Sequence, residues 1–408
     1  MDSLTQIVLG AAVGELTTGK KLGNRAMLWG AIAGTIPDLD VFVGKLYSDP
    51  ATELAFHRGI SHSFFFAATF SVLMAWLTVQ IYDKGHYKSD RFAIGVYALF
   101  ATAMVAVVAA SGFSTLGLAG AAIVAVPLLC YIGYRYNKRS KGLPYQDIHL
   151  GWKAWYWLFF WCIITHPVLD CFTVYGTQIL LPFSDQRVSF DNISVADPLY
   201  TVPFLICVAI ASFYHRNSPT RALITKAGVV ISSIYMVWTF YNKHRVSQVL
   251  EHTLASEKIP YTRYMTAPTI LNNILWTTTV ETDSIYYQGQ YSFFDSEPTF
   301  KLVPVPKNHH YLSDADGDYT IETLKWFSNN YYGVIRRKDG RLQINDLRYG
   351  SFSGKAQGED DYIFRFVVEK DSTGRYILDA AEGGPPRGRE QEIFSKLIKR
   401  IGGNTGSD

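Results

Sequence analysis

Long apolar runs alternate with short polar segments over roughly the first 241 residues, and the pattern then changes. A bilayer core is crossed by about 20 consecutive apolar residues in a helix, so runs of this length predict membrane-spanning helices. We expect spans at about 63–82, 92–111, 115–134, 152–171, 198–213 and 222–241. The first 241 residues are therefore expected to form a polytopic membrane domain.

Two shorter apolar helices are expected before these spans, at about 4–16 and 26–36. The second is interrupted at Pro37, because proline removes a helical hydrogen bond. Each carries glycines four residues apart, Gly10 with Gly14 in the first and Gly30 with Gly34 in the second, and this spacing lets helices approach closely.

Beyond residue 241 the sequence reads as soluble and rich in β-strands. We expect a connecting helix at 242–259, a β-rich domain at 260–385, and a short basic helix with a tail at 386–408. Within the domain, turns at Lys338-Asp-Gly340 and at Asp371-Ser-Thr-Gly374 separate strand-like runs and predict two hairpins. The predicted fold class is an α-helical multi-span membrane domain followed by a small soluble α+β, β-rich domain.

Loop charges give the expected orientation. Basic residues cluster in the loops after the 63–82, 115–134 and 198–213 runs, whereas the 172–197 loop has only Arg187 against three aspartates. Because loops rich in Lys and Arg stay in the cytoplasm, the first set is expected inside, with the 172–197 loop and the C-terminal domain outside. The net charge of +3 gives no argument for a nucleic-acid partner, and the sequence leaves the oligomeric state open.

Three polar motifs fall at the expected outer face: Pro37-Asp-Leu-Asp40, His57-Arg-Gly-Ile-Ser-His62 and Thr165-His-Pro-Val-Leu-Asp170. His166 and Asp170 are four residues apart and share a helix face. Ionisable residues within membrane segments are costly and usually functional. Each motif alone has a structural alternative: a His–Asp hydrogen bond that locks two helices, a polar turn, or a loop histidine.

Together the motifs supply imidazole and carboxylate ligands without thiolate, a set that suits zinc first, with manganese or iron as alternatives. Such a centre polarises a phosphoryl or acyl oxygen and acidifies water. The expected metal ligands are Asp38, Asp40, His57, His62, His166, Asp170 and, as an accessory, Asp2. Arg58 is expected to hold an anionic substrate group.

These motifs, with Met1-Asp-Ser-Leu-Thr5 at the start of the chain, resemble those of the YdjM-type bacterial inner-membrane metal-dependent hydrolases over about residues 1–200. The resemblance implies a multi-pass protein of the bacterial inner membrane with a metal-dependent hydrolytic site. It assigns that site to Asp2, Asp38, Asp40, His57, Arg58, His62, His166 and Asp170. The stretch Val195-Ala-Asp-Pro-Leu-Tyr200 resembles a variant within this group, which adds Asp197 as an accessory candidate for the catalytic site. One position departs from the family: Gln6 stands where a histidine is often found.

The expected function is a membrane-embedded, metal-dependent hydrolase near the outer membrane face, acting on a lipid, lipid-linked or phosphoester substrate. The alternatives are an ion-coupled transporter and a membrane receptor or scaffold that uses the same His/Asp cluster. Transporter sites favour the bilayer midplane and repeated halves. No internal repeat is visible in the sequence, and the motifs gather near one face.

Overall fold

A computed structural model describes residues 1–89, 92, 147–352, 354, 358–379 and 390–403. The chain divides into two compact units, residues 1–71 with 158–408, and residues 72–157. The boundaries fall within helices α5 (Phe64–Thr78) and α8 (Trp152–Asp170). The predicted spans at 92–111 and 115–134 lie outside the described residues.

In the second unit, a π-helical turn η3 (Val79–Asp83) is followed by a 3₁₀ turn η4 (His86–Lys88). The Asp83 carboxylate accepts hydrogen bonds from the backbone of Leu150 (3.1 Å) and Gly151 (2.8 Å), at the start of α8. Acceptors at a helix N-terminus satisfy amides that have no partner within the helix.

The first unit begins with α1 (Ser3–Leu22) and α2 (Asn24–Thr35), which pack against each other along their glycines. A Cβ at Gly10 would lie 2.3 Å from the carbonyl oxygen of Gly30, and one at Gly30 would lie 2.1 Å from that of Gly10. The prediction of close helix contact through both glycine pairs is confirmed. The tight turn between the helices uses Gly23 at φ +61°, a conformation that L-residues avoid.

After α2 the chain bends by 44° at Pro37, as predicted, and passes through a series of short elements. They are η1 (Pro37–Leu39), α3 (Asp40–Gly44), α4 (Pro50–Phe56) and η2 (Ile60–His62). Asp49 caps α4 by accepting from the amides of Ala51 and Thr52, and Pro50 occupies its first position. These short elements carry most of the predicted polar motifs.

The prediction of many spans is confirmed in part. Among the described residues, two helices are long and apolar enough to cross a membrane, Phe64–Asp83 and α10 (Pro219–Ser256), or three if the bent 24–44 segment is one span. The predicted 198–213 span is the shorter apolar helix α9 (Pro198–Ser212). The predicted 152–171 span is helical as α8 but is not among the candidates.

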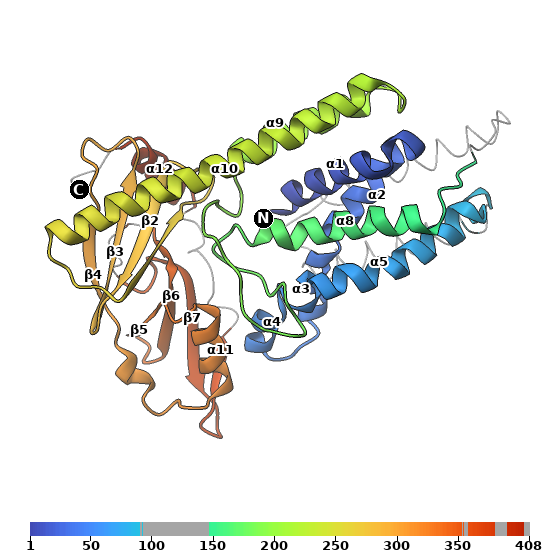
Figure 1. Cartoon of the computed structure of the whole chain (residues 1–408). Helices are drawn as coiled ribbons and strands as arrows, with labels where there is room; N and C mark the ends of the chain where they lie inside the picture. The colour runs from blue at the N-terminus through green and yellow to red at the C-terminus, as the bar shows by residue number, and fades with distance from the viewer. Residues whose placement is uncertain (90–91, 93–146, 353, 355–357, 380–389, 404–408) are drawn as a thin grey trace. The chain divides into compact units, whose positions relative to one another are not determined.

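Helix α10 is a single element of 38 residues, about 57 Å long (Figure 1). The connecting helix predicted at 242–259 is its C-terminal part, which ends at Ser256. Met236, in its first half, packs among α1 and α9, and Val246, Leu250 and Leu254 pack on the first sheet. The helix continues past residue 241 because its buried face exchanges helical neighbours for a sheet.

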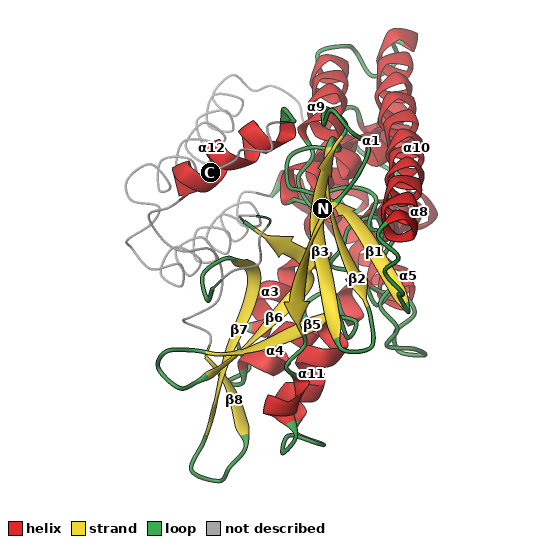
Figure 2. Ribbon diagram, turned by 90° about the vertical axis from the view of Figure 1, so that its left-hand side faces the viewer, coloured by secondary structure: helices red, strands yellow, loops and turns green. Residues whose placement is uncertain are grey.

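The C-terminal domain consists of two four-stranded antiparallel sheets, which confirms the β-rich prediction (Figure 2). The first has the order β1 (Arg263–Pro268), β2 (Leu275–Glu281), β3 (Ile285–Ser292), β4 (Lys301–Pro306). The second has the order β5 (Tyr332–Arg336), β6 (Leu342–Ser351), β7 (Tyr362–Lys370), β8 (Tyr376–Asp379). Both predicted hairpins are present, as β5–β6 and β7–β8.

Three further elements complete this domain: η5 (His309–Leu312), α11 (Tyr319–Phe327) and α12 (Glu390–Ile401). Helix α11 packs on the second sheet through Ile321 and Leu324, and Leu54 of α4 joins the same core. The domain therefore contacts the segment that leads into the histidine motif.

Candidate metal centre

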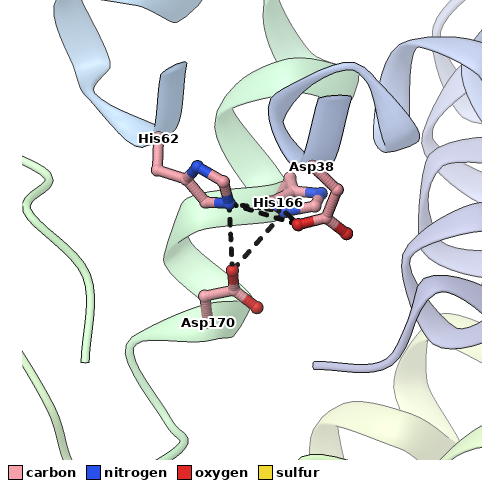
Figure 3. A group of neighbouring side chains, drawn as sticks. All are labelled: Asp38, His62, His166 and Asp170. Atoms are coloured by element: carbon pink, nitrogen blue, oxygen red, sulfur yellow. Dashed lines mark hydrogen bonds and ion pairs between the residues drawn. The ribbon is translucent and has the colours of Figure 1, made fainter. Parts of the chain in front are cut away.

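Four side chains from three separate segments point toward one another (Figure 3). Asp38 comes from η1, His62 from η2, and His166 with Asp170 from the last turns of α8. One ligand atom from each lies within 4.8 Å of the others. The sequence predicted all four residues as metal ligands, and the i, i+4 pair in α8 faces the cluster as expected.

The spacing of these atoms fits a metal ion. His62 Nε2 and His166 Nε2 are 3.1 Å apart, and Asp38 Oδ1 lies 3.4 and 3.3 Å from them. Asp170 Oδ2 is 3.4 Å from each nitrogen. Ligands about 2.0–2.1 Å from a tetrahedral ion are separated by roughly 3.3–3.4 Å. Five of the six donor separations are thus close to those around one ion, and all of the donor atoms lie within 4.8 Å of one another.

The cluster is buried on all sides except one. The side chains of His62, His166 and Asp170 are 0–1% exposed, whereas that of Asp38 is 24% exposed. Water would therefore reach the cluster from the side of Asp38.

The other ring nitrogen of each histidine is held by a neighbour. His166 Nδ1 lies 2.6 Å from the carbonyl oxygen of Gly34, so it donates to it and leaves Nε2 free to accept. His62 Nδ1 lies 3.0 Å from Ser61 Oγ and 3.3 Å from Asp40 Oδ2. Metal-binding histidines are commonly oriented in this way by a carbonyl or a carboxylate.

The packing of α1 on α2 contributes to this geometry. A Cβ at Gly34 would lie 2.6 Å from the carbonyl oxygen of Gln6, so the glycine permits the close approach of α1. The same residue presents the carbonyl that orients His166.

Asp40 and His57, also predicted as ligands, lie beside the four-residue cluster. Asp40 Oδ1 lies 2.9 Å from His57 Nδ1, and Asp40 Oδ2 accepts from the Arg58 amide (3.0 Å) and from Ser61 Oγ (2.9 Å). One carboxylate thus orients both histidines of the motif. His57 is 28% exposed on its side chain, and its Nε2 is not used in the described hydrogen bonds.

Arg58 lies between the Asp40–His57 pair and the four-residue cluster. Its backbone has φ +58°, a left-handed conformation that is rare for a non-glycine residue and turns the chain sharply between the two histidines. Its Nη1 donates to Thr173 Oγ1 (3.0 Å), and its Nε lies 3.3 Å from Asp170 Oδ2. The predicted anion clamp is therefore buried, and it partly neutralises Asp170.

Gln6, the position that departs from the family pattern, lies at the cluster. Its Nε2 donates to Asp170 Oδ1 (3.0 Å) and to the His166 carbonyl (3.3 Å). The Met1 amine also pairs with Asp170 Oδ1. Asp170 Oδ2 and Gln6 Oε1 are buried without a hydrogen bond among the described residues. Asp170 Oδ2 has Arg58 Nε at 3.3 Å, and both oxygens have the capacity to contact a cation at the cluster.

The two remaining predicted residues, Asp2 and Asp197, are N-caps of helices. Asp2 caps α1, where its carboxylate accepts from the Thr5 amide (3.1 Å) and from the Thr5 hydroxyl (2.5 Å). Asp197 caps α9 and accepts from the Tyr235 hydroxyl (2.9 Å). Neither belongs to the four-residue cluster, so a catalytic part for Asp197 stays a prediction.

The carboxylates around His62 change its acidity. Burial alone would lower the pKa of His62, but Asp170, Asp38 and Asp40 outweigh it and raise the pKa to about 10. Without a metal the imidazole is therefore protonated at neutral pH. A cation at the cluster would replace that proton.

Comparison with known proteins gives a family and one relative of unstated activity. The sequence profile described as YdjM inner membrane protein matches residues 1–246. A protein of Bacillus subtilis (strain 168) described as "Uncharacterized protein YfhP" is 27% identical over 241 residues, which are 56% of this chain and 64% of that protein. The matched part is thus less than two thirds of the relative's length. No solved structure matches the chain.

Proposed function

The chain belongs to the YdjM inner membrane protein family, and we propose that it is a metal-dependent hydrolase whose centre is formed by Asp38, His62, His166 and Asp170. The observation that supports this most is the separation of 3.1–3.4 Å between the imidazole nitrogens of His62 and His166 and from each of them to the carboxylates of Asp38 and Asp170. Such a donor set favours zinc first, and manganese or iron after it. A bound ion supplies Lewis-acid polarisation of an ester oxygen and acidifies water.

His57 is the residue proposed to move a proton. Asp40 fixes its Nδ1 in a hydrogen bond of 2.9 Å and so selects the tautomer whose Nε2 can accept or release a proton. A carboxylate that orients a histidine in this way also stabilises the imidazolium that forms. His57 would protonate the leaving group of a substrate that lies on its exposed side.

Arg58 is proposed to orient an anionic substrate group, such as a phosphoester. Its Nη1 and Nε contact Thr173 and Asp170, and its Nη2 has no hydrogen bond among the described residues. A guanidinium suits phosphate because it offers several donors in one plane. The outer-face location of this site and the extracytoplasmic side of the C-terminal domain are further proposals, which rest on loop charge alone.

The test is metal content and hydrolysis in matched variants. We expect the purified full chain to bind about one zinc ion and the double variant His166→Ala/Asp170→Ala to bind none, since half of the donors are removed. Hydrolysis would be measured with p-nitrophenyl phosphate and p-nitrophenyl butyrate, which separate phosphoester from carboxylester chemistry. His57→Ala should keep the metal and lose at least about 100-fold in rate.

A matched control is His252→Ala/Asp185→Ala, which changes the same residue types at exposed positions away from the cluster. It should retain both zinc and activity. A folded wild-type chain that binds no zinc, manganese or iron would refute the metal centre.

A structural metal centre is the second candidate, because four protein ligands already complete a tetrahedral shell. It predicts a bound ion whose removal lowers the melting temperature. In that case neither substrate would be turned over and His57→Ala would have no effect. The exposed edge at Asp38 favours the hydrolase, since a catalytic ion needs access to water.

A further inference from the structure

A cavity of about 750 Å³ lies beside the His57–Arg58 side of the site. It is enclosed by the segments that hold the histidine motif and by the C-terminal domain. The helical part contributes residues around Asp40, His57 and Arg58, together with the 173–175 and 193–195 segments. The C-terminal domain contributes β1, β6, β7, β8 and one face of α12.

Most of the cavity wall is apolar. Its apolar side chains, taken from both parts of the unit, include Val174, Ile193, Ile363, Phe364, Phe366 and Leu378. Ile393 and Leu397 of α12 add a further apolar surface. Pockets of roughly 300–1,000 Å³ with apolar walls and a few polar groups are typical of small-molecule sites.

Uncommitted hydrogen-bond donors also line this cavity. The Tyr349 hydroxyl is buried and has no hydrogen-bond partner among the described residues. Arg58 and His57 line the same cavity. The Nη2 of Arg58 has no hydrogen bond among the described residues, and the His57 ring is hydrogen-bonded through Nδ1. Other basic groups on the wall are already paired, such as Arg348 with Asp346. The carboxylate of Glu53 also lines the cavity, without an ion pair among the described residues. The available groups at the His57–Arg58 end and on β6 are donors, which suit an anionic acceptor.

Apolar residues exposed at the surface mark a way into the cavity. Val41, Val195 and Ile270 belong to its lining, and each is 38–49% exposed. An apolar chain entering there would remain in contact with apolar side chains.

We propose that this cavity binds an amphiphile with an anionic phosphate head, its chain against the C-terminal domain and its head toward His57 and Arg58. The proposal rests on the proposed function, because it names the substrate class of that hydrolase. It also gives the C-terminal domain a part in the reaction. The domain would select substrates by their apolar chain, while the helical part supplies the chemistry.

The test is a binding series with hexyl, octyl, decyl and dodecyl phosphate. It uses the full chain in detergent with a chelator present, so that no metal or turnover is needed. Burial of each methylene should tighten binding by up to about fourfold, until the chain exceeds the cavity. Inorganic phosphate should bind far more weakly than dodecyl phosphate. Affinity that does not depend on chain length would overturn the proposal.

Neighbouring residues of α12 supply a matched pair of variants. Leu397 lines the cavity and Ile398 is 52% exposed outside it. Leu397→Glu places a charge on the apolar wall and should weaken dodecyl phosphate binding by at least tenfold, whereas Ile398→Glu should change it less than twofold. Equal effects of the two variants would contradict the proposal. Leu378→Glu on β8, compared with the exposed Ile377→Glu, repeats the test on another element, and a melting temperature checks that each variant folds.

Two sources could supply this chemistry, a straight-chain phospholipid and an isoprenoid phosphate. Farnesyl phosphate compared with dodecyl phosphate separates them, and preferential binding of either supports the proposal. Chain-dependent binding without hydrolysis in the metal-loaded protein would refute the hydrolase and leave the cavity assignment intact. Hydrolysis without any dependence of binding on chain length would support the hydrolase and refute the cavity assignment.

Discussion

Asp346 on strand β6 and Asp170 at the end of α8 are both fully buried, but the groups that surround the two carboxylates differ. Asp346 is matched by one arginine. Arg348 donates to it from Nε (3.0 Å) and Nη2 (2.7 Å), and the Arg348 amide adds a third bond (3.0 Å). Although burial would lower it, Asp346 holds the pKa of Arg348 above its ordinary value. This is a closed ion pair.

Asp170 has several partners, but they do not satisfy both oxygens of its carboxylate with hydrogen bonds. Its Oδ2 has no hydrogen bond among the described residues, and it faces the Nε2 atoms of His62 and His166 and, beyond them, the carboxylate of Asp38. Two carboxylates and two imidazoles directed at one point repel unless a proton or a cation lies between them. The comparison indicates that burial of a charge alone does not mark a functional site. Convergence of imidazoles and carboxylates from separate segments on one point does.

The largest expected effect comes from breaking the closed pair. Arg348→Met leaves Asp346 buried and unpaired, which should lower the free energy of unfolding by about 3–5 kcal/mol. The double variant Asp346→Leu/Arg348→Met should recover most of that loss, because neither charge remains. Chemical unfolding of the full chain, followed by near-ultraviolet circular dichroism, measures both. A double variant as unstable as the single one would show that the pair is more than a local balance of charge.

Asp40 tests the open cluster without removing a ligand. Asp40→Asn keeps the shape of the side chain but weakens the acceptor that orients His62 and His57. Loss of such an orienting group typically weakens metal binding about 10–100-fold. Zinc titration against a competing chelator measures the affinity. Asp346→Asn is the comparison at an equally buried acid outside the cluster, and it should leave zinc affinity unchanged.

The pH dependence of zinc binding gives the next effect. Since the pKa of His62 is about 10 in the metal-free fold, binding at neutral pH must displace one proton. Affinity should therefore rise about tenfold per pH unit between pH 7 and 9. In the metal-free chain the sign is reversed: the stability from protonated His62 is complete below about pH 6.5 and is lost as the pH rises toward 10. Calorimetry in buffers of different ionisation enthalpy counts the proton, and a pH-independent affinity would contradict the assignment.

Local patterns predicted much of this structure. The i, i+4 spacing placed His166 and Asp170 together, the two turns gave both hairpins, and the glycine pairs gave the α1–α2 contact. The His57–His62 motif contributes His62 to the four-residue cluster. These features depend on residues close in sequence, where helical and turn geometry leave few choices.

Sequence spacing could not tell which residue of each motif reaches the cluster. Asp38 and Asp40 lie in and just after a 3₁₀ turn, where residues two apart point in different directions. Asp38 therefore reaches the Nε2 atoms of His62 and His166, whereas Asp40 contacts the Nδ1 atoms of His57 and His62. The left-handed backbone of Arg58 separates the two histidines of the motif, and the His57 ring lies against Asp40 beside the cluster. Such conformations are set by long-range contacts, among them the Asp40 bond to the Arg58 amide.

Gln6 gives the smallest and most discriminating expected effect, since sequence alone marked it only as a departure from the family. Gln6→Ala removes one donor to Asp170 and should weaken zinc binding about two- to tenfold, the contribution of a single hydrogen bond. Gln6→Glu instead directs a carboxylate at the cluster, where the buried Oε1 now has no hydrogen bond among the described residues. If that oxygen faces a cation, Gln6→Glu tightens zinc binding while Gln6→Ala weakens it. If Gln6 only supports α8, both substitutions weaken zinc binding, because each removes the same amide donor. Changes of opposite sign in the zinc affinity of Gln6→Glu and Gln6→Ala would therefore place the side chain of residue 6 at the ion.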